Sequence, residues 1–249
     1  MGKLAEISTT LEHAARVDLA AAFRLAVRMD LHEGVCNHFT LMLPDGKRFL
    51  LNAYGLHWSE VTASNLLALD QNGTVLEGEG EAEKTAFTIH SRIHLANPKA
   101  ACVLHTHMPY ATALTLTEPG RLEMVEQNAL RFADDIAYDD TYNGLVVDDA
   151  EGDRLARVLG DKRVLFLANH GVIVVGPTVA EAYDLMYYLE RACRVQVLAR
   201  ATGLPFRKVR PEVVRETYRL ILPDTPKYAG AHFAALKRIL DREEADYAR

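Results

Sequence analysis

Residues 164–175 read VLFLANHGVIVV and consist of two apolar runs separated by the triplet Asn169-His170-Gly171. Short, nearly continuous apolar runs bounded by turn residues are typical of buried strands. The sequence therefore predicts strands at residues 164–168 and 172–175. We expect the glycine after His170 to permit a close backbone approach or a positive φ angle.

The flanking segments predict the rest of the architecture. Two hairpins are expected, one turning at Pro44-Asp45-Gly46 and the other at Gln71-Asn72-Gly73, because these residues favour tight turns. A further buried strand is expected at 101–105, and helices are expected at 11–31, 84–96, 109–116, 150–159 and 178–201. Strands and helices do not alternate regularly enough for a doubly wound parallel sheet. We predict a single α/β domain over 1–249 with a mixed, largely antiparallel sheet, a core at about 13–202 and a helical C-terminal extension at 203–249.

Composition excludes several classes of protein. The 249 residues include 28 basic and 34 acidic side chains, and the net charge of −6 argues against a general nucleic-acid binder. The three cysteines lie far apart, which argues for a reducing compartment rather than a disulfide framework. No secretory signal and no membrane-spanning apolar run are apparent. We expect a soluble cytoplasmic protein that binds neither nucleic acid nor membranes.

The motif His105-Thr106-His107 directly follows the apolar run Ala101-Cys102-Val103-Leu104 of the predicted strand. Side chains at i and i+2 of a strand point the same way, about 7 Å apart, so two imidazoles can converge on one ion. His170 is the best candidate for a third ligand. Three histidines with an open position are typical of catalytic zinc and suit other divalent metals. The alternative is that these histidines are only hydrogen-bonded structural residues.

A second pair, His90 and His94, lies one helical turn apart and is also able to share a metal. The helix lacks the glutamate of a zincin motif between them, and apolar residues surround His90. We therefore expect these two imidazoles to be hydrogen-bonded in the core.

Five motifs together resemble the class II aldolase/adducin family. They are NAYGLHWSEVTAS from Asn52, HSRIHLANP from His90, HTHMP from His105, NHGV from Asn169 and ACRVQV from Ala192. The resemblance implies an αβα layered fold with a central, mainly antiparallel sheet. It also implies a divalent metal held by His105, His107 and His170, and a homotetramer with active sites at subunit interfaces.

The chain departs from the family's sugar-phosphate aldolases at the position of the acid/base carboxylate. Aligning their Ser-Ser-Glu signature with this chain gives Lys84-Thr85-Ala86, and Ala86 cannot transfer a proton. The later glutamate of the family's dehydratases aligns with Gln127-Asn128. Glu83 and Glu126 are near in sequence, although a regular local structure would point both elsewhere.

The remaining site predictions follow from this alignment. Lys84 is placed where a cation favours an anionic substrate, and the Tyr142 hydroxyl is placed near the metal as a proton donor. A solvated Lys84 and a packed Tyr142 are the alternatives. The predicted substrate-binding residues are Asn37, His38, Gly55, Thr85 and Gln127.

The sequence thus predicts a metal-dependent lyase that cleaves a C–C bond, by aldol cleavage or decarboxylation, in a small anionic carbonyl or carboxylate substrate. Zinc is the preferred metal, with manganese, cobalt or iron as alternatives. Two other functions are a non-catalytic scaffold like the adducin head and a non-haem iron oxygenase on the same three histidines.

Overall fold

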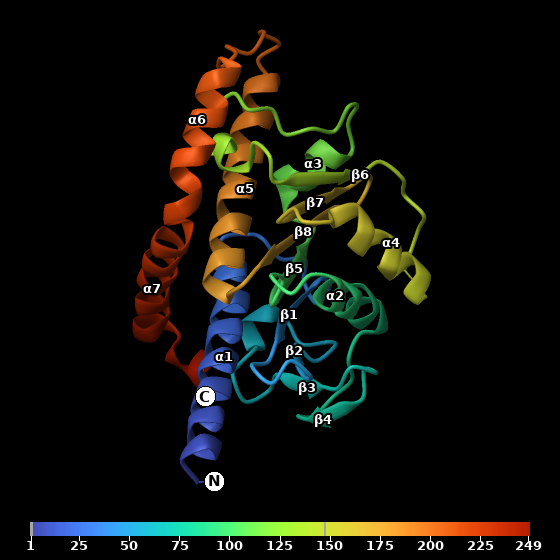
Figure 1. Cartoon of the computed structure of the whole chain (residues 1–249), viewed down its shortest axis with the longest axis vertical. Coiled ribbons are helices and arrows are strands. Elements are labelled where there is room, and N and C mark those ends of the chain that lie inside the picture. Colours follow the sequence, from blue (N-terminus) through green and yellow to red (C-terminus); the bar gives the residue numbers. More distant parts are fainter. Residues whose placement is uncertain (1, 147) are drawn as a thin grey trace.

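The computed structural model describes residues 2–146 and 148–249. Within these residues one sheet has the strand order β4-β3-β2-β1-β5-β8-β7-β6 (Figure 1). Its strands are β1 (His38–Met42), β2 (Phe49–Leu51), β3 (Leu67–Leu69), β4 (Val75–Glu77), β5 (Cys102–Thr106), β6 (Ile136–Asp139), β7 (Val164–Leu167) and β8 (Gly171–Gly176). Neighbouring strands are antiparallel except for the parallel pair β6 and β7, which confirms the predicted mainly antiparallel sheet.

Helices cover both faces of the sheet, which gives the predicted αβα layers (Figure 1). One face carries α2 (Lys84–Ala96) and α4 (Asp149–Leu159). The other carries α1 (Gly2–Arg28), α3 (Pro109–Thr115), α5 (Val179–Arg200) and α7 (Thr225–Glu243), with α6 (Pro211–Ile221) beside them. Short 3-10 helices are η1 (Trp58–Glu60), η2 (Ala129–Phe132), η3 (Leu222–Asp224) and η4 (Ala245–Ala248).

Most predicted elements are found within a residue or two of their expected ends, and three differences are informative. The first helix starts earlier than expected, at Gly2, and ends at Arg28 because Asp30 adopts a φ of 57°. Strand β6 was not predicted, since its four residues show neither alternation nor a continuous apolar run. Strand β8 extends to Gly171 and Gly176, beyond the apolar run that predicted it.

Alternation along β1 and β5 separates an apolar layer from a polar one. Phe39 of β1 and Leu104 of β5 pack in the large core beneath α1 and α5. On the opposite face His38 and Thr40 of β1 contact α2, and His105 of β5 follows the same alternation. The face covered by α2 therefore collects buried histidines.

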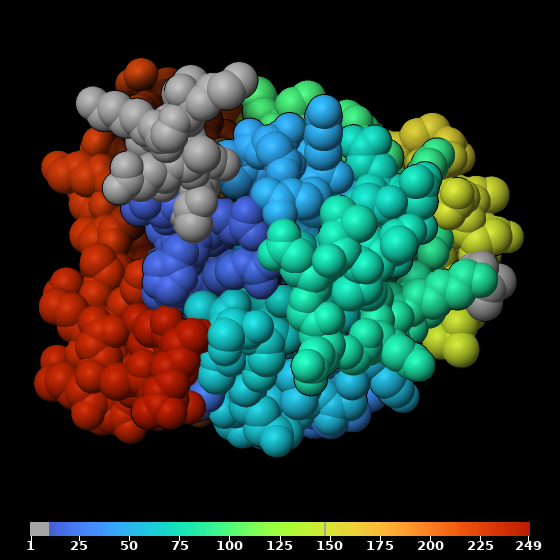
Figure 2. Space-filling view, turned by 90° about the horizontal axis from the view of Figure 1, so that it is seen from below, coloured from blue at the N-terminus to red at the C-terminus, as the bar shows by residue number. Residues whose placement is uncertain are grey.

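The C-terminal segment lies against α1, as Figure 2 shows where red and blue surfaces meet. Arg24 of α1 donates to Asp246 at 2.8 Å and to the carbonyl oxygen of Val61 at 2.9 Å. The ring of Tyr247 is buried beside them. Among the described residues, no helix combines the length and the apolar character that crossing a membrane requires.

Candidate metal centre

Three histidines meet where the central strands β5 and β8 of the sheet end and begin. His105 is in β5, His107 follows that strand, and His170 lies between β7 and β8. Their ring centroids are 4.7–5.0 Å apart, and one nitrogen from each lies within 4.8 Å of the others. The structure thus brings together the three residues that the sequence singled out as metal ligands.

Hydrogen bonds orient two of these rings. The Nδ1 of His105 donates to the carbonyl oxygen of Val172 at 3.0 Å, and the Nδ1 of His107 donates to the carboxylate of Glu33 at 2.5 Å. Both rings therefore carry their proton on Nδ1, and their Nε2 lone pairs are available. The Nε2 of His107 is buried without a hydrogen-bond partner. An orphaned buried acceptor beside two other imidazoles fits a divalent transition metal.

The cluster depends on a close approach of two strands. A Cβ atom on Gly171 would lie 2.6 Å from the carbonyl oxygen of Thr106 and 2.8 Å from the His107 ring. Only glycine fits there, so the predicted close approach is confirmed, while the positive φ of 57° belongs to Asn169. Burial, followed by the nearby His107, lowers the pKa of His170 to about 4, so this ring is neutral and able to bind a metal at pH 7.

A cavity of about 250 Å³ opens in front of the three histidines. Much of its wall is apolar or aromatic, contributed by Val35, Leu51, Tyr54, Ile89 and Leu145. The side chains of Tyr54, Tyr142 and Leu145 are exposed at this cavity. Among the described residues that line it, none is a lysine or an arginine.

Four of the other predicted site residues also line this cavity, namely Asn37, His38, Thr85 and Tyr142. Asn37, with a φ of 70°, accepts a hydrogen bond from the backbone N–H of His107 at 3.1 Å. The Tyr142 ring lies 6.3 Å from the His170 ring and is exposed, so it is not packed beneath a loop.

The structure does not bring Lys84, Gly55 or Gln127 to the cavity wall. Lys84 lines a different cavity together with Gln71, Asn72 and Arg92. Lys84 and Thr85 are the first two residues of α2, and successive side chains of a helix point in different directions. Thr85 therefore faces the metal centre and Lys84 does not. Gly55 lies next to the lining residue Tyr54, and Gln127 is exposed just before η2.

Ala86 is fully buried in an apolar cluster with Leu51 and Leu67 and does not line the cavity. Glu83 does line it, contrary to the expectation that this carboxylate points elsewhere. Its carboxylate caps α2 by accepting from the backbone N–H groups of Thr85 and Ala86. Glu126 instead accepts from two backbone N–H groups beside η2 and is outside the cavity wall.

His90 and His94 are hydrogen-bonded and buried, as predicted. Two relevant residues were missed. Glu33 orients His107, and its position next to Gly34 before Asn37 is the only sequence signal for it. Asn52 lies in the cavity wall with a buried Oδ1 that has no partner, and it heads the motif beginning NAYGL.

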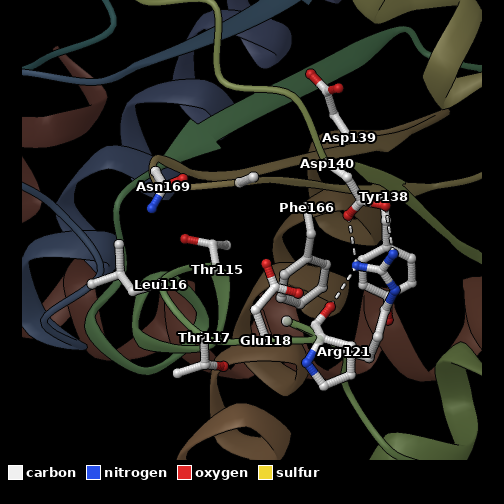
Figure 3. A pocket seen from close by; sticks show the side chains of 13 residues that line it. Thr115, Leu116, Thr117, Glu118, Arg121, Tyr138, Asp139, Asp140, Phe166 and Asn169 are labelled. Carbon is white, nitrogen blue, oxygen red and sulfur yellow. Dashed lines mark hydrogen bonds and ion pairs between the residues drawn. The ribbon is translucent and has the colours of Figure 1, made fainter.

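A second cavity of about 290 Å³ lies beyond Asn169 and is shown in Figure 3. Its cation, Arg121, donates to both carboxylate oxygens of Asp140 and lies 4.1 Å from the Tyr138 ring centroid. Asp139, which also lines it, is paired with Arg154. Asp140 neutralises the charge of Arg121, so the described residues that line this cavity offer no free cation to an anion.

Fold and cluster together define a layered α/β protein with a three-histidine centre at the ends of its central strands. Residues 17–197 match the family described as Class II Aldolase and Adducin N-terminal domain. The chain is 33% identical to an adducin-related protein of Schizosaccharomyces pombe, covering 96% of this chain and 78% of that protein.

Two solved structures are similar to this chain in both sequence and fold. An aldolase II superfamily protein from Pseudomonas syringae is 33% identical with a TM-score of 0.87, covering 96% of both chains. An L-fuculose 1-phosphate aldolase from Glaciozyma antarctica is 26% identical with a TM-score of 0.82, covering 93% of this chain and 92% of that one. The chain therefore belongs to the class II aldolase/adducin family.

Proposed function

We propose that this protein is a divalent-metal-dependent lyase that cleaves a C–C bond next to a carbonyl or carboxylate in a small anionic substrate. The observation that carries the proposal is the convergence of His105, His107 and His170 on one point beside an open cavity. A purely structural protein has no need for the unpartnered Nε2 of His107. Zinc is the preferred ion, with manganese, cobalt or iron as alternatives.

In this proposal a bound metal ion and the side chains of the cavity wall have different roles in the reaction. A bound divalent metal acts as a Lewis acid and supplies the positive charge that the lining lacks. Asn37 and Thr85 offer polar groups for positioning the substrate, and the Tyr142 hydroxyl, which is exposed in the same cavity wall, is our candidate for the proton donor. Glu83 is the one carboxylate among the described residues of the wall, so it is the first candidate for a proton acceptor.

The apolar part of the wall favours a substrate with an apolar or aromatic body over a sugar phosphate. Both aldol cleavage and decarboxylation suit such a compound. The test is a panel of hydroxy-, keto- and aromatic carboxylates and sugar phosphates, assayed with zinc, manganese and cobalt. We expect metal-dependent turnover of a carboxylate that is lost in His170→Ala. Turnover that survives in His170→Ala, or no turnover with any metal, would contradict the proposal.

Two further functions have specific support. The adducin-related relative favours a scaffold, which would neither bind metal tightly nor turn over substrate. Three histidines with open positions also suit an iron oxygenase, whose activity would stop without dioxygen. Metal content by elemental analysis and an anaerobic assay separate these from a lyase.

We also propose a homotetramer whose subunits meet near the cavity, where Tyr54, Tyr142 and Leu145 are exposed. Size-exclusion chromatography with light scattering should give about four times 27.7 kDa. A monomer would contradict the shared site. The cytoplasmic location stays a prediction.

A further inference from the structure

A chain of hydrogen bonds links four buried side chains of β1 and α2 behind the metal centre. It starts at the carbonyl oxygen of Ala100, which lies 2.5 Å from Nδ1 of His94. The Thr40 hydroxyl lies 2.8 Å from Nε2 of His94 and 2.7 Å from Nδ1 of His90. Finally, Nε2 of His90 lies 3.0 Å from Nδ1 of His38. The chain therefore ends at His38, in the wall of the cavity.

The carbonyl oxygen fixes the direction of every bond because it can only accept. His94 must carry its proton on Nδ1, so its neutral ring accepts at Nε2 from the Thr40 hydroxyl. That hydroxyl has a single proton, and its oxygen accepts from Nδ1–H of His90. His90 in turn accepts at Nε2 from Nδ1–H of His38. All three rings are thus protonated at Nδ1, and the Nε2 of His38 carries no proton.

Burial keeps the three rings neutral, which the direction of the chain requires. His38, His90 and His94 are 6%, 1% and 5% exposed, and no carboxylate belongs to the chain. Burial lowers the pKa of His94 to about 4, and it lowers that of His90 well below its usual range.

The Nε2 of His38 has no hydrogen-bond partner among the described residues, and its ring lies 5.0 Å from that of His105. His38 is nonetheless outside the group of three whose nitrogens converge. The amide of Asn52 lies in the same cavity wall, 5% exposed, with a buried Oδ1 that also lacks a partner. This wall therefore presents unpaired hydrogen-bond acceptors next to the metal centre.

We propose that His38 determines specificity by accepting, at Nε2, a hydrogen bond from a hydroxyl group of the substrate, and that Thr40, His90 and His94 are positioning residues that hold it as an acceptor. This inference rests on the proposed function and narrows its substrate to a hydroxy carboxylate or hydroxy carbonyl compound. A site built to bind a hydroxyl discriminates strongly against an analogue that lacks it, because the buried acceptor is then left unpaired.

The tautomers are measured directly by ¹⁵N NMR of the imidazole groups in the full-length, metal-free protein at pH 7. We expect His38, His90 and His94 all to be neutral and protonated at Nδ1. Thr40→Val removes the hydroxyl that joins His94 to His90. The carbonyl oxygen of Ala100 then no longer fixes the direction of the hydrogen bond between His90 and His38, so His38 should become a mixture of both tautomers. Thr88→Val, a buried threonine of α2 outside the chain, should leave His38 unchanged. A His38 protonated at Nε2 in the wild type, or the same spectrum in Thr40→Val, would overturn the inference.

Binding to the zinc-loaded protein then tests the hydroxyl. Mandelate and phenylacetate are matched aromatic carboxylates that differ by one hydroxyl group. We expect the preference for mandelate to fall on the order of tenfold in His38→Leu and to fall less in Thr40→Val, with zinc content unchanged. An unchanged preference, or no binding of either compound to the wild type, would overturn the inference. Failure to bind zinc, manganese, cobalt or iron overturns the proposed function instead, and the metal-free spectra still decide the tautomers.

Discussion

Two groups of three histidines occupy the same face of one sheet, and they differ in what their nitrogens contact. In the first group, His105, His107 and His170 converge, and the Nε2 of His107 is buried without a partner. In the second group, all ring nitrogens of His38, His90 and His94 are paired except the Nε2 of His38. The number of histidines is equal, so the hydrogen-bond partners decide which group is able to hold a metal.

The comparison also shows how an oxygen acceptor at Nδ1 fixes the tautomer of an imidazole ring and so leaves its Nε2 without a proton. The carbonyl oxygen of Val172 and the carboxylate of Glu33 each accept a hydrogen bond from Nδ1–H of one predicted ligand, which leaves its Nε2 for a metal. The carbonyl oxygen of Ala100 likewise accepts from Nδ1–H of His94, but there the Thr40 hydroxyl donates a hydrogen bond to the Nε2. Protein partners occupy every ring nitrogen of the second group except the Nε2 of His38, whereas the first group keeps its convergent nitrogens at the cavity.

The largest expected effect separates the two groups outright. His105→Ala, His107→Ala and His170→Ala should each weaken zinc binding by more than about 100-fold, because a missing ligand is worth more than a missing orienting group. His94→Ala removes a histidine of the second group and should keep zinc binding, as should His13→Ala on the exposed part of α1. Isothermal titration with zinc measures this. Full affinity in His170→Ala would remove the three-histidine centre.

A second prediction concerns the pH dependence of stability in metal-free protein. Unfolded histidines titrate near 6.5, whereas burial keeps His94 neutral until its folded pKa of about 4. Between these two pKa values the unfolded state binds more protons than the folded state. The contribution of His94 to the free energy of unfolding is therefore fully present above pH 6.5 and is lost as the pH falls toward 4. His94 alone accounts for about 3 kcal/mol of that loss.

Burial raises the pKa of Glu190 to about 7, so protonation of this carboxyl stabilises the folded protein as the pH falls. This gain offsets roughly the loss of stability that one buried histidine causes. The other buried histidines, His38 and His170 among them, add to the loss on acidification. Urea unfolding in the presence of a chelator at pH 7, 6 and 5 measures the net effect. Stability that stays constant or rises on acidification would show that these rings are not buried and neutral.

A third, smaller effect tests the orienting carboxylate. Glu33→Gln still accepts a hydrogen bond from His107 but loses the negative charge, so zinc affinity should fall about 10- to 100-fold. Glu79→Gln, in an exposed loop, is the matched control and should change nothing. Equal zinc affinity in both variants would mean that Glu33 does not orient the ligand.

The smallest effect concerns the backbone that closes the first group. Gly171→Ala should destabilise the protein by about 1–3 kcal/mol, because the new methyl group meets the backbone oxygen of Thr106. Gly230→Ala in α7 meets no atom within 4 Å and should stabilise the helix by about 0.5–1 kcal/mol. Thermal unfolding distinguishes the two signs. A neutral Gly171→Ala would imply that β5 and β8 do not approach closely.

Local patterns predicted much of this structure. The apolar runs around Asn169-His170-Gly171 gave β7, β8 and the third histidine, and the limits of α2 follow from the sequence before Pro98. Contacts between distant residues were not predictable in this way. Glu33 and His107 are 74 residues apart, and β6 pairs in parallel with β7 across the intervening helix α4.

Side-chain direction at an element boundary was the other failure. The sequence placed Lys84 and Ala86 at the substrate because an alignment gives positions and not orientations. At the start of α2, successive residues point about 100° apart, so Thr85 faces the cavity while Lys84 and Ala86 face elsewhere.

The most direct test of the central claim is X-ray absorption spectroscopy at the zinc edge of the fully loaded wild-type protein. The account predicts one zinc ion per chain, with three imidazole nitrogens at about 2.0–2.1 Å and the remaining position taken by oxygen. His94→Ala should give the same spectrum. Four imidazole ligands would show that His38 belongs to the metal centre, and two or fewer would contradict the division of the histidines into two groups.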